Sequence, residues 1–151
     1  MFSLFKKKKF FSDQENEKIV AAIQHAEKCT SGEIRVFVES RCKFIDPLDR
    51  AIEIFAQLKM ENTQDRNAVL FYVALKDRQL AIYADSGIHQ KVGDQFWQEV
   101  VNTIISHFNR ENYAEGISRC IEEIGDALKE HFPYDEHEDK NELPDEIIFG
   151  R

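Results

Sequence analysis

The sequence has few of the features that mark secreted, membrane-spanning or metal-stapled proteins. Its three cysteines are odd in number and lack Cys-x-x-Cys spacing, which argues against a disulfide framework or a structural zinc site. No apolar run approaches the roughly 20 residues that cross a bilayer, and no signal-peptide core follows the start. We therefore expect one domain of 151 residues in a reducing compartment, the cytoplasm.

The short motifs of common enzymes are also missing. The sequence has no Gly-x-Gly-x-x-Gly, Walker loop or Gly-x-Ser-x-Gly, and its five histidines show no metal-ligand spacing, so we expect no organic cofactor. One stretch, Cys29 to Arg35, does have the Cys-x-x-Gly-x-x-Arg spacing of a cysteine phosphatase loop. Such a loop leaves a strand and enters a helix. Here a helical pattern precedes Cys29 and a strand pattern follows it, so we interpret the stretch as a helix exit.

Charge is abundant but unevenly placed. The net charge is −8, with a basic start at Lys6–Lys9 and an acidic end. We predict a basic, aromatic N-terminal arm at residues 1–11 and an acidic, mobile tail at residues 134–151. The arm either contacts an anionic membrane weakly or covers an edge of the core, and we favour the second because no acylation signal supports anchoring. An acidic body repels phosphate backbones, so the expected partners are a divalent cation or another protein, not nucleic acid.

Residues 12–133 predict one α/β domain. Local capping signals and apolar periodicity predict helices that begin at Ser12, at Asp46-Pro47, at Asp94 and near Tyr113, and strands at residues 33–39, 68–75 and 79–85. The last two strands form a hairpin, and a helix joins the first two, which are therefore parallel. This order gives a layered α/β domain with a small mixed sheet.

This topology brings polar residues from distant loops to one end of the sheet, where the first two strands begin and the third ends. Oxygen donors of this kind are the ligands of Ca²⁺ and Mg²⁺. We predict a site for one of these cations, with the ligands Glu33, Asp65, Asn67, Asp85 and Asp94. Taken singly, each residue has a structural explanation, such as a turn or a helix cap.

The same end could also hold a phosphate ester. Asp85 is then the predicted catalytic residue, as cation ligand or base, and the predicted substrate-binding residues are Arg35, Thr63 and Gly87. The opposite end of the sheet carries charges of both signs, among them Glu39 and Arg50, and we predict a solvated surface there.

With these residues in view, the chain resembles the TPM domain family. The resemblance spans about residues 11–132 and rests on Thr30–Val36, Asp65–Leu70, Asp77-Arg78, Ile82–Ile88, Phe108, Tyr113 and Gly116. It implies a three-layer α/β/α sandwich, an acidic cleft that binds divalent cations, and the phosphatase activity ascribed to the family. It also implies cleft positions for Asn67, Asp85 and Gly87, with Asp94 at the start of the next helix.

The chain departs from the family pattern in two respects. Alanines at Ala68 and Ala84 stand where the family often has glycine, which puts close backbone approach at those positions in question. The signal peptide and membrane anchor of many members are not apparent, so we carry no envelope role over.

Three functional hypotheses remain open. The first is a cation-dependent phosphatase, and the second is a non-enzymatic, cation-stabilised domain that assists the assembly of other proteins. The third is the cysteine phosphatase loop, which predicts that Cys29→Ser abolishes turnover whereas chelation does not. The residues favour cation binding over either catalytic hypothesis, because no nucleophile has a clear base partner.

Overall fold

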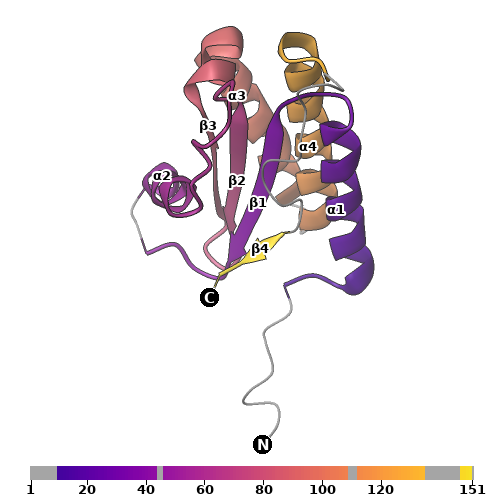
Figure 1. Cartoon of the computed structure of the whole chain (residues 1–151). Coiled ribbons are helices and arrows are strands. Elements are labelled where there is room, and N and C mark those ends of the chain that lie inside the picture. The colour runs from indigo at the N-terminus through magenta and orange to yellow at the C-terminus, as the bar shows by residue number, and fades with distance from the viewer. Residues whose placement is uncertain (1–9, 44–45, 109–111, 135–146, 151) are drawn as a thin grey trace, which may run out of the picture.

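The computed structural model describes residues 10–43, 46–108, 112–134 and 147–150 (Figure 1). Their elements in chain order are α1 (Asp13–Glu27), β1 (Glu33–Glu39), α2 (Pro47–Gln57), β2 (Ala68–Ala74), β3 (Gln79–Ala84), α3 (Ser86–Phe108), α4 (Tyr113–His131) and β4 (Ile148–Phe149). Within these ranges, no helix combines the length and apolarity needed to cross a membrane.

The four strands form one mixed sheet in the order β3-β2-β1-β4. β1 runs parallel to β2, with Glu33 opposite Ala68, and β2 runs antiparallel to β3, with Val69 opposite Ala84. The parallel pair and the hairpin are both confirmed. The start of β2 and the end of β3 therefore lie beside the start of β1, as the predicted site requires.

The sheet is the middle of three layers. In Figure 1, α1 and α4 cover one face and α2 lies against the other. Side chains of β1 and β2 alternate between two cores: Ile34, Val36 and Val38 pack toward α1, α3 and α4, whereas Leu70 and Tyr72 pack toward α2. All seven residues of β2 are buried, as expected for a strand covered on both faces. The α/β/α architecture is thus confirmed.

Local capping signals set the starts of two helices. The Ser12 hydroxyl accepts from the N–H of Glu15, whose carboxylate accepts from the N–H of Ser12, and these two bonds form the predicted capping box. The Asp46 carboxylate accepts from the N–H of Leu48, with Pro47 at the first helical position.

The third helix begins earlier than predicted. We expected Asp94 at its start, but α3 begins at Ser86 and is interrupted at Gly93, whose φ of 78° and ψ of 171° break the helical backbone. The residues after Asp85, expected to be a turn, therefore form a short first segment of the helix. The capping signal at Asp94 predicts only the start of the second segment of α3, which follows the break at Gly93.

The chain ends are more ordered than predicted where the structure describes them. Phe11 is buried in the main core and Phe10 stacks on Phe149, which agrees with an arm that covers a core edge. Residues 147–150 were expected to belong to a mobile tail, yet Ile148 and Phe149 extend the sheet beside β1. The remaining predicted arm (residues 1–9) and the acidic stretch (135–146) lie outside the described residues.

Candidate functional site at one end of the sheet

Glu33, Ala68 and Asp85 form one row across three strands at the predicted end of the sheet. Glu33 is opposite Ala68, and the N–H of Asp85 donates to the carbonyl of Ala68 at 2.9 Å. By strand alternation all three side chains belong to the face that α2 covers. Two strand spacings separate the Glu33 and Asp85 backbones by about 10 Å, and the small side chain of Ala68 lies between them. Both acidic residues are buried.

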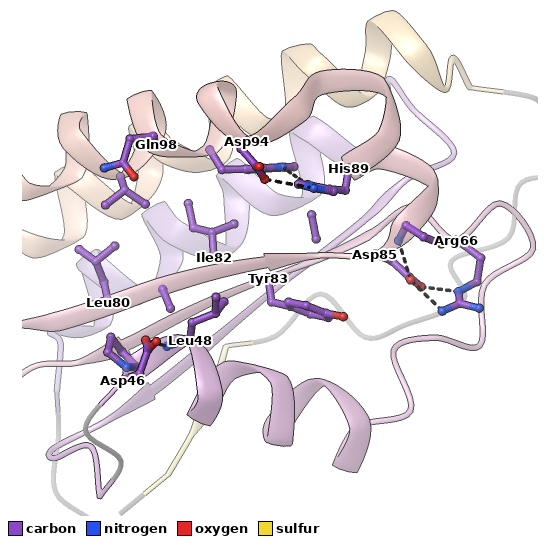
Figure 2. A pocket seen from close by; sticks show the side chains of 16 residues that line it. Asp46, Leu48, Arg66, Leu80, Ile82, Tyr83, Asp85, His89, Asp94 and Gln98 are labelled. Atoms are coloured by element: carbon purple, nitrogen blue, oxygen red, sulfur yellow. Dashed lines mark hydrogen bonds and ion pairs between the residues drawn. The ribbon is translucent and has the colours of Figure 1, made fainter.

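The carboxylate of Asp85 is paired with Arg66 (Figure 2). Arg66 Nε donates to Oδ2 at 2.6 Å and its terminal amino group to Oδ1 at 2.8 Å. The N–H of Ser86 donates to the same Oδ1 at 2.7 Å. Asp85 is 3% exposed, whereas the Arg66 side chain is 52% exposed. The hydrogen bonds to Asp85 raise the pKa of Arg66, so the buried carboxylate has a permanent counter-charge that is itself open to solvent.

Gly87 packs against the loop that carries Arg66. Its N–H donates to the carbonyl of Arg66 at 2.8 Å. A Cβ at this position would lie 2.0 Å from the carbonyl oxygen of Asp65 and 2.6 Å from that of Arg66. Close approach is therefore required at Gly87, as predicted, but the group it approaches is the backbone of the preceding loop.

The same loop contains polar atoms that are buried without a hydrogen bond from any described residue. They are Thr63 Oγ1 and Asn67 Oδ1, in residues that are 7% and 1% exposed. The amide nitrogen of Asn67 donates to Ser31 Oγ at 3.2 Å, which joins this loop to the start of β1. Buried oxygens of this kind ordinarily have a partner, so they mark a place where a further donor or a cation fits.

Two of the five predicted ligands lie apart from this group. Asp65 is exposed at the loop surface, and the Asp94 side chain is 97% exposed beside His89, whose Nε2 lies 3.2 Å from Asp94 Oδ1. The Trp97 indole N–H donates to the other nitrogen of His89 at 3.1 Å. Asp94 thus contacts His89 across the break in α3 at Gly93.

The predicted ligand set is brought together only in part. Within the described residues, no three His, Cys, Asp or Glu side chains are close enough to hold a metal ion. The acids and amides present at the row fit a hard cation by donor type, since every group there is an oxygen donor. A cation would have to replace the Arg66 guanidinium at Asp85.

The fold and the loop sequences at this site agree with one family of known proteins. The TPM domain model matches residues 4–127. The chain belongs to the TPM domain family. Among solved structures, this domain is similar to the BA42 protein of the psychrophilic bacterium Bizionia argentinensis, with 43% identity and a TM-score of 0.87 over 97% of this chain and 99% of that one.

Two further solved structures share the fold at lower identity. They are an N-terminal domain from P. gingivalis, with 20% identity and a TM-score of 0.67, and the N-terminal domain of cg2496 from Corynebacterium glutamicum, with 18% and 0.63. The first match covers 83% of this chain and 82% of that one, and the second 79% and 74%. No curated protein matches the chain significantly.

The cysteine phosphatase interpretation fails on the fold of this TPM domain. Cys29 follows α1, and the residues after it enter β1, which is the reverse of the strand-to-helix order that an anion-binding loop needs. Arg35 lies within β1 and is buried on the sheet instead of clamping an anion at a loop.

The prediction for the opposite end of the sheet is wrong for its central pair. Glu39, expected on a solvated surface, is 6% exposed and accepts two bonds from Arg50, at 3.0 and 3.1 Å. The hydroxyl of Tyr72 donates to the same carboxylate, and the Arg50 guanidinium lies over the Phe37 ring. These contacts join β1, β2 and α2. Both strands bury this face against α2, and sequence patterning alone did not reveal that burial.

Sequence reasoning missed the place of Arg66 in the candidate site. The sequence marks this arginine only as part of the family resemblance, yet its guanidinium makes two hydrogen bonds to the buried carboxylate of Asp85. Its φ of 51° is unusual for a residue other than glycine, and its partner is 19 residues away across the β2–β3 hairpin. The available signal was that a buried acid at the end of a strand needs a nearby cationic group.

Proposed function

We propose that this TPM domain binds one divalent cation, Ca²⁺ or Mg²⁺, at the Glu33–Ala68–Asp85 row. The observation that carries the proposal is the state of Asp85: a buried carboxylate whose counter-charge comes from a half-exposed arginine. A half-exposed guanidinium can leave the carboxylate and remain solvated, and a metal ion that takes its place supplies the counter-charge that the buried carboxylate needs. The carboxylate of Glu33 and the amide oxygen of Asn67 would complete the protein ligands.

Two further observations support the site. The unbonded Thr63 Oγ1 and Asn67 Oδ1 belong to the loop that leads directly into β2. Ala68 keeps the space between the two acids free of a large side chain. Asp65 and Asp94 remain proposed ligands of a wider site, which would require each to move from its surface position.

The test is an amide NMR titration of the chelator-stripped protein with CaCl₂ and, separately, MgCl₂. We expect shifts at Gly32-Glu33, at residues 65–67 and at residues 85–88. Asp85→Asn should abolish them. Arg66→Gln should tighten binding several-fold, because it removes the group that competes for the carboxylate.

A control variant and two further results test the proposed cation site. Glu130→Gln changes an exposed acid on α4 and should leave affinity unchanged. Loss of affinity in Asp94→Asn would extend the site to α3. Absence of shifts at millimolar cation in both the native protein and Arg66→Gln would refute the cation site.

We further propose that the bound cation at this site supports the hydrolysis of a phosphate ester. It would use Asp85 as ligand or base, with Thr63, Gly87 and Arg35 near the ester. Both oxygens of Asp85 accept from Arg66, so a catalytic role requires that pair to open. With p-nitrophenyl phosphate, turnover should require the cation, vanish in Asp85→Asn and survive Cys29→Ser. Cation binding without turnover above the blank would leave the domain as a binding module.

A further inference from the structure

One edge of the sheet has no pairing partner among the described residues. β3 is at the end of the strand order, and the N–H of Asp85, just past the strand, points to β2. In a regular antiparallel ladder the N–H and C=O of alternate residues point the same way. Those of Ala84, Ile82 and Leu80 therefore point away from β2, and no hydrogen bond between described residues reaches them.

The sequence and pairing of β3 also lack the features that usually protect an edge strand. Natural edge strands are shielded by charged side chains, proline, bulges or a covering segment. The six residues of β3, Gln-Leu-Ala-Ile-Tyr-Ala, include no charge and no proline, and they pair with β2 without a bulge. An unprotected edge of this kind is a ready partner for another extended chain.

A groove of about 730 Å³ follows this edge between α2 and α3 (Figure 2). Pro47 and Leu48 form the wall on α2, and Trp97, Gln98 and Val101 form the wall on α3. The residues of β3 lie between the two walls, as Figure 2 shows for Leu80, Ile82 and Tyr83. The groove is thus an apolar channel with a backbone edge along its length.

Two acidic side chains other than Asp85 line the groove. Asp46 lies at the end near Leu80, and Asp94 lies on the α3 wall between Gln98 and His89. The one arginine of the lining, Arg66, is bound to Asp85 and does not offset these two charges. A basic ligand with apolar side chains is complementary to this surface.

We propose that the groove binds an extended, basic peptide segment of another protein, which pairs with β3 as an additional strand. Backbone bonds to Leu80, Ile82 and Ala84 would provide affinity, and alternate side chains would contact the α2 and α3 walls. The length of β3 suits about six residues, or roughly 20 Å of extended chain. The inference does not depend on the cation site, although the two sites meet at Asp85.

The probe is a fluorescein-labelled peptide of alternating valine and threonine with a lysine at each end. In EDTA we expect saturable anisotropy at micromolar concentrations, with amide shifts along residues 79–85. Two N-methylated versions, each blocked at alternate amides, should differ sharply: one binds and the other does not. Equal binding of the two would overturn strand pairing.

Two α2 side chains of similar exposure provide a matched pair of variants. Leu48 is 39% exposed and lines the groove, whereas Ile52 is 41% exposed and does not. Leu48→Lys should weaken the basic peptide about tenfold, through lost apolar contact and charge repulsion. Ile52→Lys should leave affinity unchanged. Equal effects of the two substitutions would refute the groove as the binding site.

A second copy of this chain is the competing occupant. Sedimentation velocity that shows dimers in the native protein but not in Leu48→Lys would assign the edge to self-association and overturn the proposal. The peptide titration is run in EDTA, so it does not depend on a bound cation. If the protein binds the peptide but shows no amide shifts with Ca²⁺ or Mg²⁺, the result supports the groove and refutes the cation site. Cation binding without peptide binding would do the reverse.

Discussion

At the scale of single residues, Gly87 is the position that constrains the site most tightly. An added Cβ would meet the carbonyl oxygens of Asp65 and Arg66, which are backbone atoms that cannot rotate away. We expect Gly87→Ala to lower the free energy of unfolding by about 2–3 kcal/mol. Urea denaturation measures the loss, and amide shifts at residues 65–67 should show that the loop has moved.

Gly32→Ala is the comparison for that substitution. The atoms nearest to its Cβ would belong to the side chain of Leu128, which can change rotamer, so we expect a loss of about 1 kcal/mol. If Gly32→Ala costs as much as Gly87→Ala, packing against the Arg66 loop is not what makes Gly87 necessary.

The candidate site could be predicted from the sequence only as far as strand topology reaches. The expectation that Glu33, Asn67 and Asp85 come from neighbouring strand ends holds, because a parallel pair and a hairpin dictate it. The pairing of Arg66 with Asp85 depends on where a loop side chain points, and periodicity carries no information about that. The position of Asp94 was likewise decided by the break at Gly93.

At the scale of elements, an ion pair between the buried Glu39 and the partly exposed Arg50 joins the sheet to α2. Glu39 accepts two bonds from Arg50 and one from Tyr72. These bonds to Glu39 raise the pKa of Arg50, and burial, with the adjacent carboxylate, raises the pKa of Tyr72. We expect Arg50→Met to cost about 3 kcal/mol of unfolding free energy, because it leaves a buried carboxylate without its cation.

Companion variants test that explanation. Tyr72→Phe should cost about 1.5–3 kcal/mol, the value of a hydrogen bond to a charged group. The double variant Glu39→Leu with Arg50→Met should regain much of the single-variant loss, because it removes both charges. A loss under about 1 kcal/mol in Arg50→Met would mean that the pair behaves as the solvated surface pair expected from the sequence.

The starts of two helices were predictable because their capping signals are local. Ser12 and Asp46 cap their helices through neighbouring backbone N–H groups, so the starts of α1 and α2 follow from the sequence. β4 is different, because Ile148 and Phe149 become a strand only through the free edge of β1. The three apolar residues 147–149 after a long acidic stretch carry too little pattern to predict that pairing.

At the scale of the whole molecule, the first and last described segments of the chain meet on the sheet. The rings of Phe10 and Phe149 stack at 5.7 Å between centroids, and the N–H of Gly150 donates to the carbonyl of Val38 at 2.7 Å. The Gly150 bond pairs β4 with β1, whereas no described residue pairs with the outer side of β3. β4 has two residues and β3 has six, so β3 is the longer edge strand that another chain could extend.

The packing of α1 on α4 gives the molecule an acid-dependent stability. Hydrogen bonds from Lys18 on α1 and from Arg119 lower the pKa of Glu115 in the folded protein. The charged Glu115 therefore stabilises the fold above the pKa of the unfolded state. This stabilisation is lost as the pH falls through the lower pKa of the folded state.

Glu123 on the same helix has the opposite shift. Burial, together with Asp126, raises the pKa of Glu123, so its charged form opposes folding at neutral pH. At pH 7 Glu115→Gln should destabilise by less than about 1 kcal/mol and Glu123→Gln should stabilise. Urea denaturation should show both differences shrinking toward pH 3, and a Glu115→Gln loss that persists there would assign it to packing instead of charge.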